Sequence, residues 1–168
     1  MPTTIIKGNV YASRRAEDVE DLKLCLIGYL DYKIPDPISR GDRWIFPSFP
    51  DIDIKRPAIS ITQVGADPNN DFVVGDGASM VVYMFDIEAF VDTLTAGTIN
   101  SVSYTQSHLI DVIIDEIEKA IYRGRTYMKT NYNVVDMLIV NRVPFDYDNA
   151  MDNFRASIRV GLQIQFNK

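Results

Sequence analysis

Cysteine and histidine are nearly missing from this sequence, which has a single residue of each type among 168. With Cys25 as its one cysteine, the chain cannot form an internal disulfide, and this fits a reducing compartment. Cys25 and His108 could in principle form a catalytic thiol–imidazole pair. However, Cys25 stands between two leucines of a predicted helix, where a small buried cysteine is the more common case. We therefore expect no nucleophilic catalysis from this pair.

Basic charge and long apolar runs are also scarce. The formal net charge is -6 and the sequence pI is about 4.7. This balance argues against a general nucleic-acid-binding protein, because such proteins need a basic face to displace counterions. The longest apolar run, residues 80–85, is too short to cross a bilayer, and the N-terminal residues lack the pattern of a signal peptide. We expect a soluble, cytoplasmic protein without a membrane partner.

A complete set of metal ligands is missing as well. Asp67, Asn69 and Asp71 match the first three ligand positions of a calcium-binding loop. The match then ends, because Phe72 stands where that loop needs glycine and Ala78 where it needs glutamate. A calcium site is therefore not expected here.

Two other groups of acidic residues suggest weaker alternatives. His108, Asp111 and Asp115 have a helical spacing that could hold a metal, although such residues more often form a solvated helix face. A second group lies in a predicted loop and could bind a metal for phosphoryl chemistry: Asp146, Asp148 and Asp152. This group leaves a small metal-dependent nuclease or phosphoesterase as an alternative function. From all these patterns we expect no catalytic residue, no metal and no cofactor.

The clearest pattern that is present lies near the C-terminus, in residues 154–166. Every even position there is apolar, and the odd positions hold arginine, serine, glycine or glutamine. This alternation predicts a strand with one dry face and one wet face. At about 3.3 Å per residue the strand would be roughly 40 Å long, about twice the usual length. Such a strand must cross a whole sheet or reach beyond its own subunit.

The remaining chain predicts an α+β domain that covers residues 1–168. We expect a single mixed or antiparallel sheet of about four long strands, with two helices packed on one face. The order is helix, strand, strand, helix, strand, strand. The predicted helices are residues 13–30 and a helix capped by Ser103 and Gln106 that ends at Gly124. The predicted strands are residues 58–64, 80–92, 134–140 and 154–166, with a turn-rich connection at 65–79 and a loop at 141–153.

Residues 32–57 contain several prolines and predict a long loop, because neither a helix nor a central strand tolerates so many. Its aromatic residues Trp44, Phe46 and Phe49 either contact a neighbouring protein, since aromatics often anchor interfaces, or close the core of their own chain. The connection at 65–79 offers a similar choice. Its apolar residues Phe72, Val73 and Val74 belong either to an arm that reaches an adjacent subunit or to a simple turn.

The polar face of the last strand carries four candidate contact residues: Arg155, Arg159, Gln163 and Gln165. They form a channel face, an interface or a solvated sheet face. Arg155 and Arg159 could oppose the acids of the strand at 80–92, namely Asp86, Glu88 and Asp92. Opposite charges across a ladder contribute about 0.2 to 1 kcal/mol each and help to fix the register.

The overall layout resembles one known family. An acidic N-terminal helix precedes a proline-rich segment that ends in residues 56–61, and a long strand follows at 83–90. Then come an amphipathic helix and a last hairpin, in which residues 144–148 lead into 154–160. This layout resembles the tail terminator, or tail completion, proteins of tailed bacteriophages and their relatives. Neck and head–tail joining proteins look similar and are the alternative.

The resemblance implies a homohexameric ring that caps the tail tube, ends tail growth and offers a docking surface to the head connector. The implied partners are the tail tube protein, the head connector or neck protein, and the sheath protein in a tail that has one. DNA would pass through the ring without specific binding. The implied location is the virion, at the junction of tail and neck, after assembly in the host cytoplasm. The family has no active-site motif to transfer to this chain.

Overall fold

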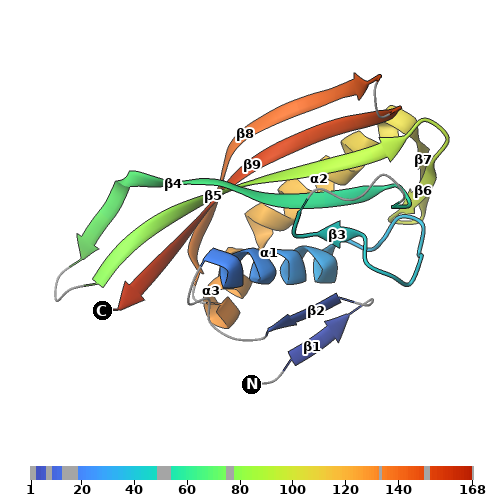
Figure 1. Cartoon of the computed structure of the whole chain (residues 1–168). Helices are drawn as coiled ribbons and strands as arrows, with labels where there is room; N and C mark the ends of the chain where they lie inside the picture. The colour runs from blue at the N-terminus through green and yellow to red at the C-terminus, as the bar shows by residue number, and fades with distance from the viewer. Residues whose placement is uncertain are drawn as a thin grey trace.

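The computed structural model describes residues 3–6, 9–12, 19–48, 54–74, 78–132, 134–149 and 152–167. Within these ranges, side chains are described for residues 19–48, 54–66, 80–132, 134–149 and 152–164. The largest sheet has five strands in the order β3-β4-β5-β9-β8 (Figure 1). Their bounds are β3 (Ile45–Phe46), β4 (Ala58–Val74), β5 (Ala78–Asp92), β8 (Val134–Asp148) and β9 (Asn153–Asn167).

Three helices and two small hairpins complete the described part of the chain. The helices are α1 (Val19–Lys33), α2 (Gln106–Arg123) and α3 (Arg125–Tyr132). One hairpin pairs β1 (Thr3–Ile6) with β2 (Asn9–Ala12), and the other pairs β6 (Ala96–Ile99) with β7 (Val102–Thr105). The α+β class is therefore confirmed. The predicted numbers of strands and helices were too low, because α3, β3 and both hairpins are short and lack a long periodic pattern.

The strand predicted from the alternating C-terminal pattern is β9, and it lies between β5 and β8. Its pairing with β5 is antiparallel and unbroken from Ala78↔Asn167 to Asp92↔Asn153. The even positions of β9 from Ala156 to Ile164 are buried, as the pattern predicted. They pack against the helices as part of one hydrophobic core.

Two strands are longer than the sequence predicted. β4 continues through most of the turn-rich segment to Val74, with register shifts between Gln63 and Gly65 and between Asp67 and Phe72. β8 continues through the predicted loop to Asp148, past Pro144. Proline is tolerated at the edge of a sheet and at a bulge, and the pairing of β8 shifts between Val143 and Asp146. The loop expected at 141–153 was therefore wrong for residues 141–148.

All three helices lie on one face of the sheet (Figure 1). α1 and α2 are joined by a buried hydrogen bond, in which the Tyr29 hydroxyl donates to the Ala120 carbonyl at 2.6 Å. α2 ends at Gly124 as predicted. Its N-cap is Thr105 without a side-chain cap bond, so the capping box expected from Ser103 was wrong. α1 extends to Lys33, beyond the predicted end at residue 30, and residues 13–18 lie outside the described part.

Gly124 lets α2 and α3 approach Tyr29. A Cβ atom at residue 124 would lie 2.1 Å from the Tyr29 hydroxyl oxygen and 2.3 Å from the ring carbon that carries it. We expect Gly124→Ala to reduce the free energy of unfolding by about 1–3 kcal/mol, because the tyrosine ring must move. Urea unfolding measures the change. The double variant Gly124→Ala/Tyr29→Leu should lose less than the sum of the single variants. Additive losses would contradict the proposed clash.

Burial, together with a smaller contribution from the nearby Tyr127, raises the pKa of Tyr29 to about 12. Because the folded-state pKa lies above the ordinary 10.0, the stabilisation is complete below about pH 10 and is lost as pH rises toward about 12. We expect the stability difference between the native protein and Tyr29→Phe to fall by about 2–3 kcal/mol over this range. Urea unfolding at each pH tests it. A pH-independent difference would contradict the assignment.

Candidate functional site

The face of the sheet opposite the helices carries two ion pairs between β9 and β5. Arg159 binds Asp86 through two contacts, Nε to Oδ1 at 2.7 Å and Nη2 to Oδ2 at 2.8 Å. Arg155 Nη2 binds Glu88 Oε1 at 2.5 Å. Arg159 stands directly opposite Asp86 in the ladder. The predicted pairing of these two arginines with acids of β5 is confirmed.

The same two arginines were candidates for a channel or interface face. Since both are engaged by carboxylates, they offer little unpaired positive charge to a nucleic acid. Gln163 lies on the same face, opposite Val82, and is partly buried. Gln165 belongs to β9, but its side chain lies outside the described residues. The use of this face as a channel or interface stays a prediction.

Asp92, the third acid named for pairing, has a different neighbour. It forms an ion pair with Arg56, whose Nε lies 4.0 Å from Oδ1. Burial raises the pKa of Asp92, Arg56 acts in the opposite direction, and Asp152 raises it again. In the ladder neither arginine stands directly opposite Asp92, since Arg155 is opposite Phe90 and Arg159 is opposite Asp86. Asp92 lies at the far end of β5, opposite Asn153.

The aromatic residues of the proline-rich loop divide between core and surface. Trp44 is completely buried within its own chain, so the expectation that it contacts a neighbouring protein was wrong and the alternative was right. Its carbonyl accepts the Ile59 N–H at 2.9 Å, which places β3 beside β4 in parallel. Phe46, the next aromatic residue, is partly buried and lines a pocket. Phe49 lies outside the described residues.

The apolar residues of the predicted hairpin connection belong to a strand. Phe72, Val73 and Val74 form the end of β4 and pair with Met80, Ser79 and Ala78. Placing them in a turn was therefore wrong, because β4 continues beyond its register shift. Their side chains lie outside the described residues. A contact with an adjacent subunit stays a prediction.

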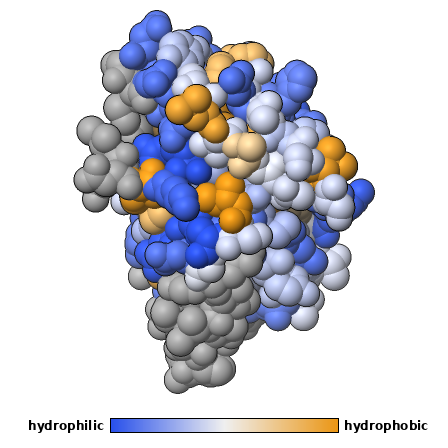
Figure 2. Space-filling model, turned by 90° about the vertical axis from the view of Figure 1, so that its right-hand side faces the viewer, coloured by the Kyte–Doolittle hydropathy of each residue, from blue (hydrophilic) through white to orange (hydrophobic). Residues whose placement is uncertain are grey.

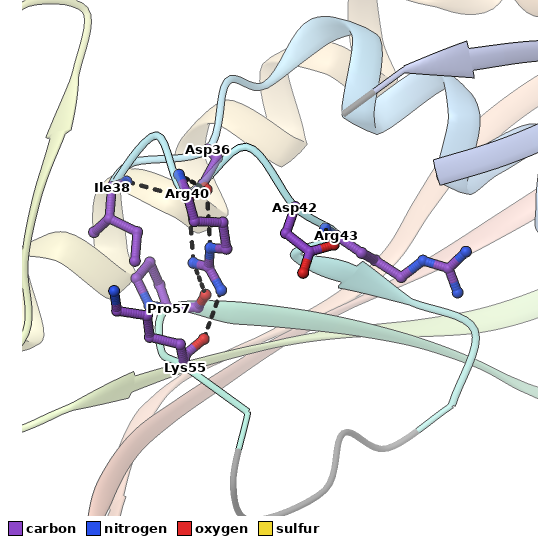
Figure 3. A network of polar contacts seen from close by, with 7 residues as sticks. All are labelled: Asp36, Ile38, Arg40, Asp42, Arg43, Lys55 and Pro57. Carbon is purple, nitrogen blue, oxygen red and sulfur yellow. Dashed lines mark hydrogen bonds and ion pairs between the residues drawn. The ribbon is translucent and has the colours of Figure 1, made fainter. Parts of the chain in front are cut away.

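A buried clamp holds the loop that carries Trp44 (Figure 3). Asp36 accepts the backbone N–H of Ile38 at 3.1 Å and of Arg40 at 2.8 Å. It also binds the Arg40 side chain through Nε at 2.8 Å and Nη2 at 3.1 Å. Arg40 in turn donates to the carbonyls of Lys55, at 2.6 Å, and Pro57, at 2.5 Å. The clamp therefore joins the beginning of the loop to its end.

This clamp was not predicted from the sequence. The local signal was Asp36 between two prolines with an arginine four residues later, a pattern in which the aspartate can bind backbone amides and stop a chain from continuing as a helix. The hydrogen bonds from Arg40 to the Lys55 and Pro57 carbonyls span 15 and 17 residues, and no local sequence pattern predicts them.

A pocket beside this clamp has a volume of about 460 Å³. Its lining is mixed in charge: Arg40, Asp42, Arg43, Phe46, Ile54 and Lys55. The donors of Arg40 are already used within the loop, and Figure 3 shows Arg43 pointing away from Arg40 and Lys55. The basic side chains therefore do not converge on one anion.

The candidate metal ligands are separated or already engaged. Asp115 binds Arg142 at 2.8 Å, and Asp152 accepts the Tyr147 hydroxyl. The Asp146 carboxylate accepts the Tyr147 N–H at 2.8 Å, and Asp148 lies two residues further along β8. Within the part of the chain that the structure describes, no group of three or more histidine, cysteine, aspartate or glutamate side chains could hold a metal ion. The geometry gives the nuclease alternative no support.

The thiol–imidazole pair finds no common site either. Cys25 is buried in the core from α1, whereas His108 is exposed in the first turn of α2. On the molecular face in Figure 2, apolar side chains are scattered among hydrophilic ones. In the described ranges, no helix has both the length and the apolar character that crossing a membrane requires.

Comparison with known proteins gives no assignment: no family model matches this chain, and no curated protein matches it. The function must therefore be argued from the arrangement of the strands, the loop clamp and the surface.

The clamp can be tested through the one tryptophan. Asp36→Ala leaves the Arg40 side chain buried without its carboxylate, and we expect a loss of about 3–5 kcal/mol in the free energy of unfolding. Arg40→Lys should also lose stability, because lysine lacks the planar fork that reaches both Asp36 and the carbonyls. We expect the Trp44 emission of both variants to shift to longer wavelength as the loop loosens.

The matched control for these variants is Asp42→Asn, which changes an exposed carboxylate in the same loop. It should change stability by no more than about 0.5 kcal/mol, as is usual for surface positions. Equal effects of Asp36→Ala and Asp42→Asn on stability and on Trp44 emission would contradict the clamp.

Proposed function

We propose that this protein is a structural component of a bacteriophage tail, which forms a ring of identical copies at the end of the tail tube. The observation that carries the proposal is the reach of the long strands. Figure 1 shows the ends of β4, β5 and β9 projecting beyond the helices as a three-stranded arm. An arm that extends past its own core gains stability by packing against another chain.

In this role the ring stops tail growth and gives the head connector a docking surface. The partners are further copies of the chain in a hexameric ring, the tail tube protein, the head connector or neck protein and, where present, the sheath protein. The acidic balance of the chain suits a conduit that lets DNA pass without holding it, since like charges repel. The pairing of Arg155 and Arg159 with β5 carboxylates supports the same conclusion.

The proposed role needs no catalytic residue, metal or cofactor, and the protein acts within the virion at the junction of tail and neck. A neck protein of similar fold is the competing assignment, since the same long strands and arm would serve it. The two roles differ in the partner: a terminator binds the tube and a neck protein binds the connector.

Assembly is the first test of this function. Light scattering after size exclusion should give a mass that is a multiple of the 19.1 kDa chain, sixfold for the hexamer, with rings visible by electron microscopy. The experiment is run over a range of concentrations, with and without purified tail tubes. A strict monomer under all these conditions would contradict the proposal.

Partner choice is tested separately, with immobilised tail tubes, immobilised connector and bare resin. We expect retention on the tubes above the resin background. Retention on the connector alone would replace the terminator by the neck protein.

A further inference from the structure

The central sheet has an open edge on each side within the described part of the chain. β8 is the last strand on one side. On the other side, β3 pairs with β4 only at Ile59 and Ser60, so the outer edge of β4 is open from Thr62 onward. An unpaired edge presents a row of free backbone N–H and C=O groups and is a template for pairing with another chain.

Both open edges also carry exposed apolar side chains. On β8 the exposed fraction is 36% for Leu138, 45% for Val140 and 48% for Val143. On β4 it is 44% for Val64. An edge strand that served only to end a sheet would be expected to carry charges at these positions, because charge discourages pairing. The side chains therefore favour contact with an apolar partner.

The directions of the long strands indicate which partner fits. The pairs β4–β5, β5–β9 and β9–β8 are all antiparallel, so the direction alternates across the sheet. A second copy that continues this alternation places its β4 beside β8, antiparallel to it. The two edges of the same chain are thus complementary in direction.

The open stretches of β4 and β8 also lie at the same position along the strand direction, as the ladder partners across the sheet show. Thr62 is level with Asp86, Arg159 and Asn141 across the four long strands. Asp67 is level with Val82, Gln163 and Asp136 in the same way.

At Met137 the carbonyl already accepts Arg125 Nε at 3.1 Å and the N–H donates to Asp136 Oδ1 at 2.8 Å. The stretch of β4 that faces free backbone is therefore residues 62–65, level with residues 138–141 of β8. Pro144 and the register shift between Val143 and Asp146 limit pairing beyond this stretch. Within it, each strand has one shift of its own, between Ile139 and Asn141 on β8 and between Gln63 and Gly65 on β4.

We propose that β8 of one copy pairs with the outer edge of β4 in the next copy, so that the sheet continues from subunit to subunit. This inference rests on the proposed ring and specifies the surfaces that form it. Such a contact uses different edges of the two copies and repeats by rotation until the ring closes. A contact of β8 with β8 would stop at two copies and leave both β4 edges open.

The test is chemical cross-linking of the full chain with Val64→Cys and Leu138→Cys combined, using a short bis-maleimide. Two strands separate these residues within one copy, so their backbones are about 14 Å apart at the usual strand spacing. We expect cross-links between copies, seen as a ladder of covalent oligomers on a denaturing gel.

Cys25 is buried and stays in all variants. Each single variant alone should give no ladder, and an equimolar mixture of the two should give mainly dimers.

The matched control replaces Val64→Cys by Leu94→Cys, because Leu94 is fully exposed but lies in the turn between β5 and β6, away from both edges. A ladder of the same yield from Leu94→Cys/Leu138→Cys would overturn the inference, since it would show random collision. Dimers from Leu138→Cys alone would also overturn it, in favour of a contact between two β8 strands. Rings without any cross-link between residues 64 and 138 would overturn the edge contact while the proposed function stands.

A second measurement does not depend on cross-linking. Val140→Lys places a charge on the β8 edge, and we expect the concentration needed for half assembly to rise about tenfold or more, which corresponds to about 1.4 kcal/mol. Leu94→Lys is the control and should assemble like the native protein. Equal assembly of both variants would overturn the inference. A native chain that never assembles, with or without tail tubes, would instead remove the proposed function itself.

Discussion

The register between β5 and β9 is the constraint on which the rest of this structure depends. It is unbroken over the full length of both strands, and it places the even side chains of β9 from Ala156 to Ile164 in the core. A shift by one residue would move this whole apolar set to the open face and bring the polar set into the core. The bonds from Arg159 to Asp86 and from Arg155 to Glu88 connect the same two strands on the open face. The burial of one face and the ion pairs of the other thus favour the same register.

The proline-rich loop depends on this sheet and in turn completes its core. β3 pairs beside β4 and brings Trp44 into the apolar core that the helices and the sheet share. The buried ion pair of Asp36 and Arg40 keeps the two ends of the loop together while the loop crosses the edge of the sheet. An ion pair at such a site provides a fixed geometry more than a large net stabilisation, because both groups lose their hydration. The clamp therefore acts as a positioning device for β3 and Trp44.

The sequence predicted the elements whose patterns are local and long. β9, α2 and the arginine–carboxylate pairs follow from periodicity and from the alternation of faces. The extension of β8 past Pro144 could not be predicted in this way, because proline stops a central strand but is tolerated at an edge, and edge position is a property of the whole sheet. The position of Trp44 could not be predicted either. An aromatic residue in a loop indicates a buried side chain, but not whether its own chain or a neighbouring chain buries it. The long-range bonds of Arg40 leave no local pattern.

The two open edges of the sheet carry backbone groups that could pair with a strand of another chain. Helices on one face bury the apolar side chains of β9, yet the outer edge of β8, and that of β4 beyond Ser60, has no strand partner within the described chain. Soluble proteins usually protect such edges with bulges, prolines or charges. Here Pro144 and the register shift between Val143 and Asp146 interrupt the second half of β8, whereas Leu138 and Val140 leave exposed apolar side chains in the first half. The interruption at Pro144 limits how many residues of β8 can pair with another strand. A short contact between copies is therefore favoured over unrestricted aggregation.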